Sequence, residues 1–345
     1  MSDDVLIVKG EEVRELLEGQ ELPVLEAVRR AYTLHAAGES ALPHSSFLRF
    51  PGDEVNRIIA LPAYLGDGFA VAGLKWIASF PGNRQQGLER ASAVLILNSC
   101  VTGRPEAVLE GSLISAARTA ASAAAAAALL ASVPPERAGL IGLGVINLAI
   151  ARYLRAVFPR LARFLLYDHH AERAAAAPAL LRRQAAGGSA ALEVEMASSA
   201  DEVLRTCPLV SFATTALTPY VEDLAPCPRG AVLLHVSLRD LAPRAILAGD
   251  NVVDDPDHVC RAQTSVHLAE QLTGGRAFIR CTLADILAGR EPARRDPDQV
   301  AVFSPFGLGV LDLAVGTLVR DLALARGRGL VIRGFLSAGA GGEGS

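Results

Sequence analysis

The sequence has no excess of basic residues. Its 345 residues include 33 Lys and Arg against 37 Asp and Glu, which gives a formal net charge of −4 at pH 7. Proteins that bind nucleic acid or anionic membranes usually carry a basic patch or stripe. We therefore expect neither nucleic acid nor a membrane among its partners.

Paired cysteines are also lacking. The five cysteines are scattered, with no CxxC pair and no histidine nearby at ligand spacing: Cys100, Cys207, Cys227, Cys260 and Cys281. This predicts reduced, mostly buried thiols and no disulfide, zinc or other metal site. The acidic start, Met1 to Asp4, does not resemble a signal peptide, so we expect a cytoplasmic protein.

No uncharged apolar run is long enough to cross a bilayer. The longest, Thr119 to Val133, is mostly alanine and is followed by Pro134-Pro135, which predicts a tightly packed helix. At 345 residues, 51% of them hydrophobic, the chain is long enough for two domains with a large buried core, and it has no internal repeat.

The clearest functional signal is the stretch from Ala138 to Asn147. A short apolar run leads into Gly142-Leu-Gly144, a segment with helical apolar spacing follows, and a second apolar run, Phe164 to Tyr167, ends at Asp168. Strand, glycine turn, helix, strand and acid is the order of a dinucleotide site. The free N–H groups and dipole of the helix N-terminus suit the pyrophosphate.

The acid at the end of the second run favours NAD over NADP. Asp168 would accept both ribose hydroxyls and repel a 2′-phosphate, although His169 and His170, read as an exposed loop, would soften that repulsion. Asn147 departs from the fingerprint, because a third Gly or Ala usually stands there. We expect the cofactor to be bound by these residues: Gly142, Gly144, Val145, Ile146, Asn147, Asp168, Thr119, Thr214, Thr215 and Ser237.

The apolar patterns predict two kinds of architecture. Strands near residues 5–8, 47–50, 56–60, 69–77, 91–98 and 105–110 read as antiparallel hairpins, with helices at 11–17, 22–37 and 115–132. From Ala138, strands near 192–196, 209–215, 231–237, 251–254 and 300–303 alternate with helices, and a last helix covers 308–325.

The fold class is therefore α/β, with a doubly wound Rossmann domain and a discontinuous α+β domain, to which the resemblance described below assigns substrate binding and dimerisation. We expect the Rossmann domain at 136–304, the second domain at 1–135 completed by 305–336, and a disordered tail from 337 to 345.

Three charged residues stand out from their surroundings. Lys75 lies within an apolar strand and either meets an anion or reaches solvent at an edge. Arg118 opens the alanine helix, where a guanidinium suits a carboxylate or phosphate. Asp240 follows a strand on the cofactor side, and its ordinary alternative is a helix cap or a salt bridge with Arg239.

Around these residues the sequence resembles the ornithine cyclodeaminase/μ-crystallin family. The resemblance runs from about residue 40 to about 325, in blocks that include Lys75 to Asn83, Gly87 to Asn98, Ser115 to Ala121 and Phe306 to Ala314. Within the family the motifs Phe47 to Phe50, Asn56 to Pro62 and Ser237 to Asp240 look most like one branch. That branch contains NAD-dependent dehydrogenases of 2,3-diaminopropionate biosynthesis, the staphyloferrin B pathway type.

The resemblance implies a reaction and a site. The substrate would be N-(1-amino-1-carboxy-2-ethyl)-glutamate, oxidised with NAD to a ketimine that water cleaves to 2-oxoglutarate and L-2,3-diaminopropionate. Arg49, Lys75 and Arg118 match substrate-contact positions, and Arg57 is a further candidate, with a solvent-facing strand position as its alternative. Asp240 matches the catalytic aspartate, a general base, and Lys75 shares the catalytic site. The family pairing of sheets implies a homodimer.

Alternatives remain open at this point. Another imine-type reaction, such as ornithine cyclodeamination, alanine dehydrogenation or ketimine reduction, suits the same scaffold. A non-catalytic μ-crystallin-like binding protein is a rival from another class, and Lys75, Arg118 and Asp240 together speak against it. Asp240-Leu-Ala-Pro-Arg replaces the Asp-x-Pro-Gly-Lys segment of other members, which argues against ornithine cyclodeaminase. The product would serve siderophore or antibiotic biosynthesis.

Overall fold

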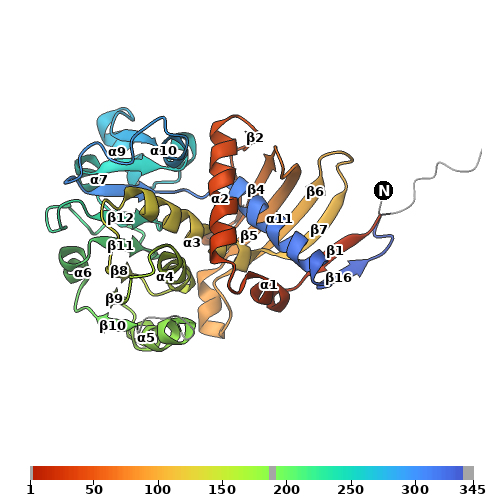
Figure 1. Cartoon of the computed structure of the whole chain (residues 1–345), viewed down its shortest axis with the longest axis horizontal. Helices are drawn as coiled ribbons and strands as arrows, with labels where there is room; N and C mark the ends of the chain where they lie inside the picture. Colours follow the sequence, from red (N-terminus) through yellow and green to blue (C-terminus); the bar gives the residue numbers. More distant parts are fainter. Residues whose placement is uncertain (1–2, 186–191, 337–345) are drawn as a thin grey trace, which may run out of the picture. The chain divides into compact units, whose positions relative to one another are not determined.

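The chain forms two compact units in a computed structural model that describes residues 3–185 and 192–336 (Figure 1). The first unit comprises residues 1–20, 37–117 and 309–345, and the second comprises 21–36 and 118–308. Helix α3 (Gly111–Leu130) carries the chain from the first unit into the second. Each unit is built around its own sheet.

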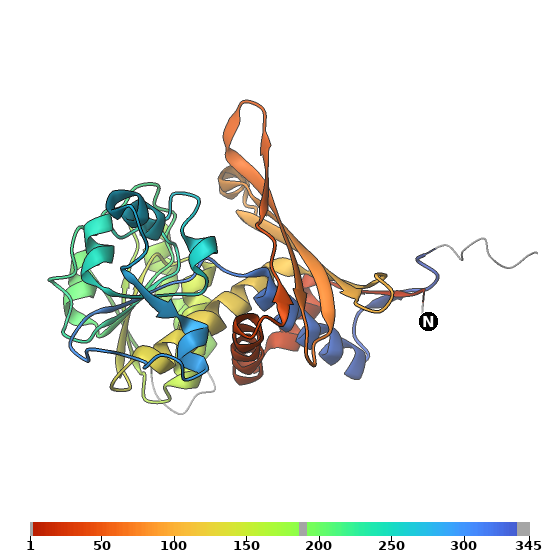
Figure 2. The ribbon, with the colours of Figure 1, turned by 90° about the horizontal axis from the view of Figure 1, so that it is seen from above.

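The first unit contains an eight-stranded sheet in the order β16-β1-β7-β6-β5-β4-β2, with β3 paired to β4. Strands β3 to β7 pair as antiparallel neighbours, as the sequence predicts, whereas β1 lies parallel to β7. Its strands are β1 (Val5–Val8), β2 (Ser40–Ala41), β3 (Ser46–Phe50), β4 (Asp53–Leu65), β5 (Val71–Ser79), β6 (Ala91–Ser99), β7 (Pro105–Glu110) and β16 (Leu330–Ile332). In Figure 2 the hairpin of β3 and β4 (orange) extends beyond the rest of this sheet.

Helix α11 (Gly309–Ala325) covers one face of this sheet, joined by α1 (Gly10–Leu17). Two glycines permit the close approach of α11. A Cβ at Gly316 would lie 2.3 Å from Leu95 Cδ2, and one at Gly73 would lie 2.6 Å from Leu313 Cδ2. Side chains alternate along a strand, so the neighbours of the α11-facing residues point to the opposite face.

The second unit contains an eight-stranded, wholly parallel sheet in the order β10-β9-β8-β11-β12-β15-β13-β14. Helices lie on both sides of it, with α6 on one and α4 on the other (Figure 1). Its strands are β8 (Arg137–Ile141), β9 (Arg163–Tyr167), β10 (Glu193–Met196), β11 (Leu209–Phe212), β12 (Val232–His235), β13 (Asp250–Val253), β14 (Ile279–Thr282) and β15 (Ala301–Ser304). Its helices include α2 (Glu21–Ala36), α4 (Val145–Val157), α5 (Ala171–Ala185), α6 (Ala200–Thr206), α7 (Pro243–Ala248), α8 (Pro256–Val259), α9 (Ser265–Thr273) and α10 (Leu283–Leu287). The α/β fold class with a Rossmann-type sheet is confirmed.

The division of the chain differs from the expected boundary at residue 135. Helix α2 and residues 118–135 belong to the second unit. Polar contacts hold α2 within that unit. Tyr32 Oη lies 2.7 Å from Ser122 Oγ, and Glu21 Oε1 forms an ion pair with Arg152 Nε at 2.8 Å. Amphipathic spacing predicts that α2 is a helix but does not say which sheet it joins.

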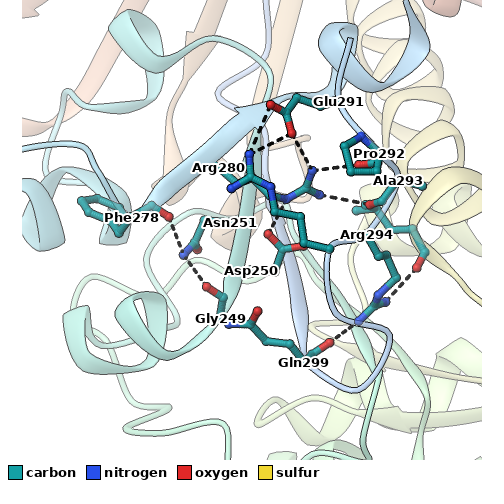
Figure 3. A network of polar contacts seen from close by, with 12 residues as sticks. Gly249, Asp250, Asn251, Phe278, Arg280, Glu291, Pro292, Ala293, Arg294 and Gln299 are labelled. Atoms are coloured by element: carbon teal, nitrogen blue, oxygen red, sulfur yellow. Dashed lines mark hydrogen bonds and ion pairs between the residues drawn. The ribbon is translucent and has the colours of Figure 1, made fainter. Parts of the chain in front are cut away.

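Hydrogen bonds hold the polar loop expected at residues 291–298 against the amino ends of β13 and β15 (Figure 3). Arg280 donates to Asp250 at 2.6 Å and to the carbonyls of Pro292 and Ala293 at 2.8 and 3.0 Å. Arg294 donates to the carbonyl of Leu130, the last residue of α3, at 2.8 Å. This network stabilises the loop and the end of α3 at the edge opposite the carboxyl ends of the strands.

The sequence patterns do not predict the three short strands β2, β14 and β16. The tail expected to be disordered, residues 337–345, lies outside the described residues. By length and composition α3 is the one described helix that could cross a membrane, but 72% of its apolar window is buried inside the structure. Of the cysteines, three are buried, Cys227 is half-buried and Cys100 is exposed.

Candidate functional site

The carboxyl ends of the parallel strands meet at one edge of the second sheet, where ligands of such sheets bind. The glycine turn follows β8, Asp168 follows β9, and Thr214 follows β11. Asp240 comes after β12, as Asp254 does after β13. The residues predicted from separate parts of the sequence therefore share this edge.

The glycine turn has the geometry of an anion cradle. Gly142 has φ of 84°, and a Cβ there would lie 2.6 Å from the carbonyl oxygen of Ala213, so the turn requires glycine. Gly144 caps α4, and a Cβ there would meet no described protein atom within 4 Å, which leaves open space at the helix end. The bond from Leu148 N to Gly144 O opens the helix, so the N–H groups of residues 145–147 have no acceptor within it. These features fit a dinucleotide pyrophosphate.

Asn147 has a structural role that the fingerprint does not predict. Its side chain is buried, and Nδ2 donates to the carbonyls of Ile141 and Gly142 at 2.9 and 2.7 Å. Its Oδ1 accepts a 2.7 Å hydrogen bond from Ser211 Oγ. The side chain thus joins α4 to the ends of β8 and β11, and a contact of Asn147 with the cofactor stays a prediction.

Asp168 is anchored at the end of β9 by backbone donors. Oδ2 accepts the N–H of Leu143 at 2.7 Å, and Oδ1 accepts the N–H of His170 at 2.8 Å. His169 and Arg173 lie 3.8 and 3.7 Å from its carboxylate. Asp168, His169 and His170 are close enough to share a metal ion, but the two histidines are exposed and proximity alone does not indicate a metal site, so we assign none.

Asp240 is completely buried, and its carboxylate is surrounded by donors. Oδ1 accepts hydrogen bonds from Thr214 Oγ1 and, at 3.1 Å, from Tyr220 Oη. Oδ2 accepts one from Ser237 Oγ and lies 3.4 Å from His235 Nε2. The expected alternative, a salt bridge with Arg239, is wrong, since Arg239 donates to the carbonyls of residues 262 and 263.

The surroundings of Asp240 favour its charged form. Burial raises the pKa of this carboxyl, but the contacts with His235, Ser237 and Thr214 outweigh burial and lower its pKa below the ordinary value. Burial and the nearby Asp240 charge raise the pKa of Tyr220. The pair is therefore a carboxylate and a neutral phenol.

The remaining predicted cofactor contacts differ in setting. The hydroxyl protons of Thr214 and Ser237 are committed to Asp240 rather than to a ligand. Thr215 is exposed beside Thr214, and Thr119 is half-buried on α3 next to Arg118. Their contact with a cofactor stays a prediction.

Arg118 lies against Gly307 within the second unit. A Cβ at Gly307, which has φ of 94°, would lie 2.6 Å from a guanidinium nitrogen of Arg118. The N–H of Gly307 donates to Asp254 at 2.7 Å, and that of Phe306 donates to the same carboxylate at 2.9 Å. The buried Asp254 thus fixes the backbone on which Arg118 rests.

Lys75 is buried in the first unit and faces an anion of the protein itself. Its side chain is 2% exposed, and Nζ lies 2.6 Å from Asp312 Oδ2 on α11 and 3.2 Å from Ser115 Oγ. The alternative of an edge lysine reaching solvent is wrong.

Arg49 and Arg57 lie directly opposite each other in the β3–β4 register. Opposite residues of an antiparallel pair point to the same face. The two side chains therefore start from the same face of the hairpin, and the exposed Arg49 places its guanidinium 5.8 Å from the centre of the Phe47 ring.

Four residues of these networks were missed by sequence reasoning: Tyr220, His235, Asp254 and Asp312. Asp312 had a signal, because it is an acid inside an apolar helix, as Lys75 is a base inside an apolar strand. Tyr220 had none, because it lies in a loop with no regular pattern.

The fold and the nucleotide edge are those of a Rossmann-type dinucleotide-binding protein with a second α+β unit. A sequence model of the ornithine cyclodeaminase/mu-crystallin family matches residues 6–327, and the chain belongs to this family.

Among its relatives is the N-((2S)-2-amino-2-carboxyethyl)-L-glutamate dehydrogenase of Staphylococcus aureus, 27% identical over 91% of this chain and 94% of the relative. The alanine dehydrogenase of Archaeoglobus fulgidus is 29% identical over 96% and 99%. An archaeal alanine dehydrogenase dimer solved with bound NAD has a TM-score of 0.84 at 27% identity, over 96% of this chain and 99% of that one. The expectation of an enzyme that uses NAD agrees with these relatives.

Proposed function

We propose that this protein is an NAD-dependent oxidoreductase that acts on the CH–NH bond of an amino-acid conjugate. The substrate is N-(1-amino-1-carboxy-2-ethyl)-glutamate, and the products are L-2,3-diaminopropionate, 2-oxoglutarate and NADH. The relative from Staphylococcus aureus, whose name describes such a dehydrogenase, supports this reaction at 27% identity.

The observation that carries the choice of substrate is the pair Arg49 and Arg57. The two arginines lie opposite each other in the β3–β4 register, and a guanidinium suits a carboxylate because it can donate two parallel hydrogen bonds to it. The conjugate has three carboxylates, whereas alanine has one. Two adjacent arginines, with Arg118 and Lys75 as further cations, suit the larger number of carboxylates.

The proposed cofactor residues are those of the glycine turn and Asp168. The N–H groups of Val145 and Ile146 at the start of α4 receive the pyrophosphate, and the carboxylate of Asp168 receives the ribose. NAD supplies a hydride acceptor for the glutamate Cα. The other steps are proton transfers and belong to the protein.

Asp240 is the proposed proton acceptor. The substrate amine is protonated in water and must become neutral before its Cα–H bond can break as hydride, so the amine proton passes to Asp240. Water then attacks the protonated ketimine carbon and loses its two protons to solvent as the C=O bond forms, while Asp240 returns its proton to the nitrogen as the C–N bond breaks, which releases 2-oxoglutarate and the neutral amine. The ionised state of Asp240 suits it to receive the amine proton.

The cationic groups hold the substrate carboxylates. The ion pair with Asp312 fixes the direction of the Lys75 side chain on β5. The planar guanidinium of Arg118, which lies against Gly307, donates two parallel hydrogen bonds to a second carboxylate.

We also propose that two copies of the chain pair through the face of the first sheet that α11 does not cover. Trp76 and Val94 lie opposite each other on β5 and β6 and are 40% and 41% exposed. Leu74 and Ile96 form the next pair on the same face. A contiguous apolar patch of this kind indicates an interface. Light scattering should give a dimer that Trp76→Glu converts to a monomer, whereas a monomeric parent protein would overturn the proposal.

One assay separates the proposed reaction from its rivals. Purified protein with NAD and the conjugate should form NADH and 2-oxoglutarate in equal amounts. Alanine dehydrogenation forms NADH with alanine instead, cyclodeamination releases ammonia without net NADH, and a binding protein forms neither. Asp240→Asn is the control with strongly reduced turnover, and full turnover in this variant would remove the aspartate from the mechanism.

A further inference from the structure

The proton acceptor of the proposed reaction does not reach the surface. Asp240 has no exposed area, and hydroxyl groups occupy both carboxylate oxygens. A general base must lie within hydrogen-bond reach of the proton that it accepts, directly or through one intermediate. One of the groups that contact Asp240 must therefore carry the proton.

Tyr220 is the most exposed of these groups. It is 43% exposed, whereas Thr214 and Ser237 are half-buried and His235 is buried. Its hydroxyl donates to Asp240 Oδ1 at 3.1 Å. Thr214 is a poorer carrier, because its oxygen already accepts the N–H of Ala216 at 3.1 Å.

The backbone holds Tyr220 in this position. The N–H groups of Tyr220 and Val221 both donate to the carbonyl of Asp240 at 2.9 Å, and Val221 forms a bridge with Leu241. The phenol is thus fixed beside the carboxylate at the carboxyl edge of the sheet, with one side turned to solvent.

We propose that Tyr220 is the residue that exchanges protons with the substrate amine and that Asp240 acts through it. This inference rests on the proposed function. The amine proton moves to Tyr220 Oη while the phenol proton moves to Asp240 Oδ1. The phenol ends as it began, and Asp240 ends protonated. The same path in reverse returns a proton to the amine nitrogen when the C–N bond breaks.

The charges around Asp240 and Tyr220 favour a neutral phenol as the group that carries the proton. Asp240 faces Tyr220 and His235, and Tyr167 and Asp168 lie near enough to Tyr220 to act on it electrostatically. The raised pKa of Tyr220 keeps the phenol protonated, so it serves as a relay and not as a phenolate base.

The first test is a double-mutant cycle on the conjugate reaction. Tyr220→Phe should lower kcat by about 10² to 10⁴, the usual contribution of a proton-transfer group. Titration should show unchanged NAD binding. Asp240→Asn added to Tyr220→Phe should cost less than about threefold more, because both residues serve one path. Tyr64→Phe, a similarly exposed tyrosine of the first unit, is the matched control and should keep full activity.

The second test separates a relay from a merely structural hydroxyl. Replacing Tyr220 with fluorotyrosines keeps the ring and the hydrogen bond but makes the phenol more acidic. The logarithm of kcat should vary linearly with the acidity of the phenol, which a structural hydroxyl would not produce.

The outcomes are distinct. A parent protein that turns over no amine or imine overturns the proposed function and the relay with it. An active parent whose Tyr220→Phe variant keeps kcat within about threefold overturns the relay alone. So does a cycle in which the two single losses multiply, or a fluorotyrosine series with constant kcat.

Discussion

Asp312 Oδ2 lies 2.6 Å from Lys75 Nζ, and both side chains are almost completely buried within the first unit. The pair joins α11 to β5 and gives Lys75 a fixed direction. A buried charge is costly unless it is paired, so the two residues depend on each other.

Asp312→Asn should lower the free energy of unfolding by about 3–5 kcal/mol, because it leaves the Lys75 charge buried without its partner. Urea denaturation measures this loss. Lys75→Met combined with Asp312→Leu should restore most of the stability but no activity. A single variant as stable as the parent would contradict the account of this pair.

Asn147→Ala should destabilise the protein although alanine is common at this position of the fingerprint. It removes the donors to the carbonyls of Ile141 and Gly142, at a cost of about 1–3 kcal/mol for buried groups left without partners. NAD affinity should fall as well, since the glycine turn loses its support. Thermal unfolding and NAD titration test both effects, and a more stable variant would show that the carbonyls find other donors.

Gly307→Ala should disturb Arg118 without disturbing the nucleotide site. The new Cβ would lie 2.6 Å from the guanidinium, and the positive φ adds strain. We expect KM for the anionic substrate to rise at least about tenfold, because the substrate loses one charge-assisted hydrogen bond from Arg118. The affinity for NAD should not change. Gly274→Ala has the same backbone strain and no neighbour within 4 Å, and it should leave KM as it was.

Asp254 should give the protein an unusual pH dependence. Burial raises its pKa from 3.8 to about 6. Between these values the native carboxyl binds more protons than the unfolded one, so the stability that it contributes falls as the pH rises. Asp254→Asn should flatten this decline in urea unfolding across that pH window.

Asp53→Asn is the control for this pH effect. Hydrogen bonds from Asn56 and Val55 lower the pKa of the exposed Asp53 carboxylate, so its contribution is lost only as the pH falls below the ordinary value of 3.8. An Asp254→Asn slope equal to that of the parent would contradict the raised pKa.

Much of the fold is predictable because each element has a local pattern. The apolar run before Gly142 and the helical spacing after it give β8 and α4, and the hairpins from β3 to β7 follow from alternation and turn residues. The placement of α2 beside the parallel sheet is not predictable in this way, because helical spacing does not reveal that Tyr32 bonds to Ser122.

The sequence indicates which residues belong to the candidate site, but it does not predict how their side chains contact one another. Gly142, Asp168 and Asp240 follow from motif and resemblance. That Asn147 supports the glycine turn, or that Tyr220 and Ser237 close around Asp240, depends on the direction in which side chains of irregular turns and loops point, even where the partners lie only a few residues apart. No spacing rule predicts such contacts.

The central claim is tested most directly by incubating the purified protein with NAD and N-(1-amino-1-carboxy-2-ethyl)-glutamate. NADH is followed by absorbance, and 2-oxoglutarate and diaminopropionate by mass spectrometry. The account predicts the three products in equal amounts, formed at least about a hundredfold more slowly by the Asp240→Asn variant. NADH formed from alanine but not from the conjugate, or no NADH from either, would contradict it.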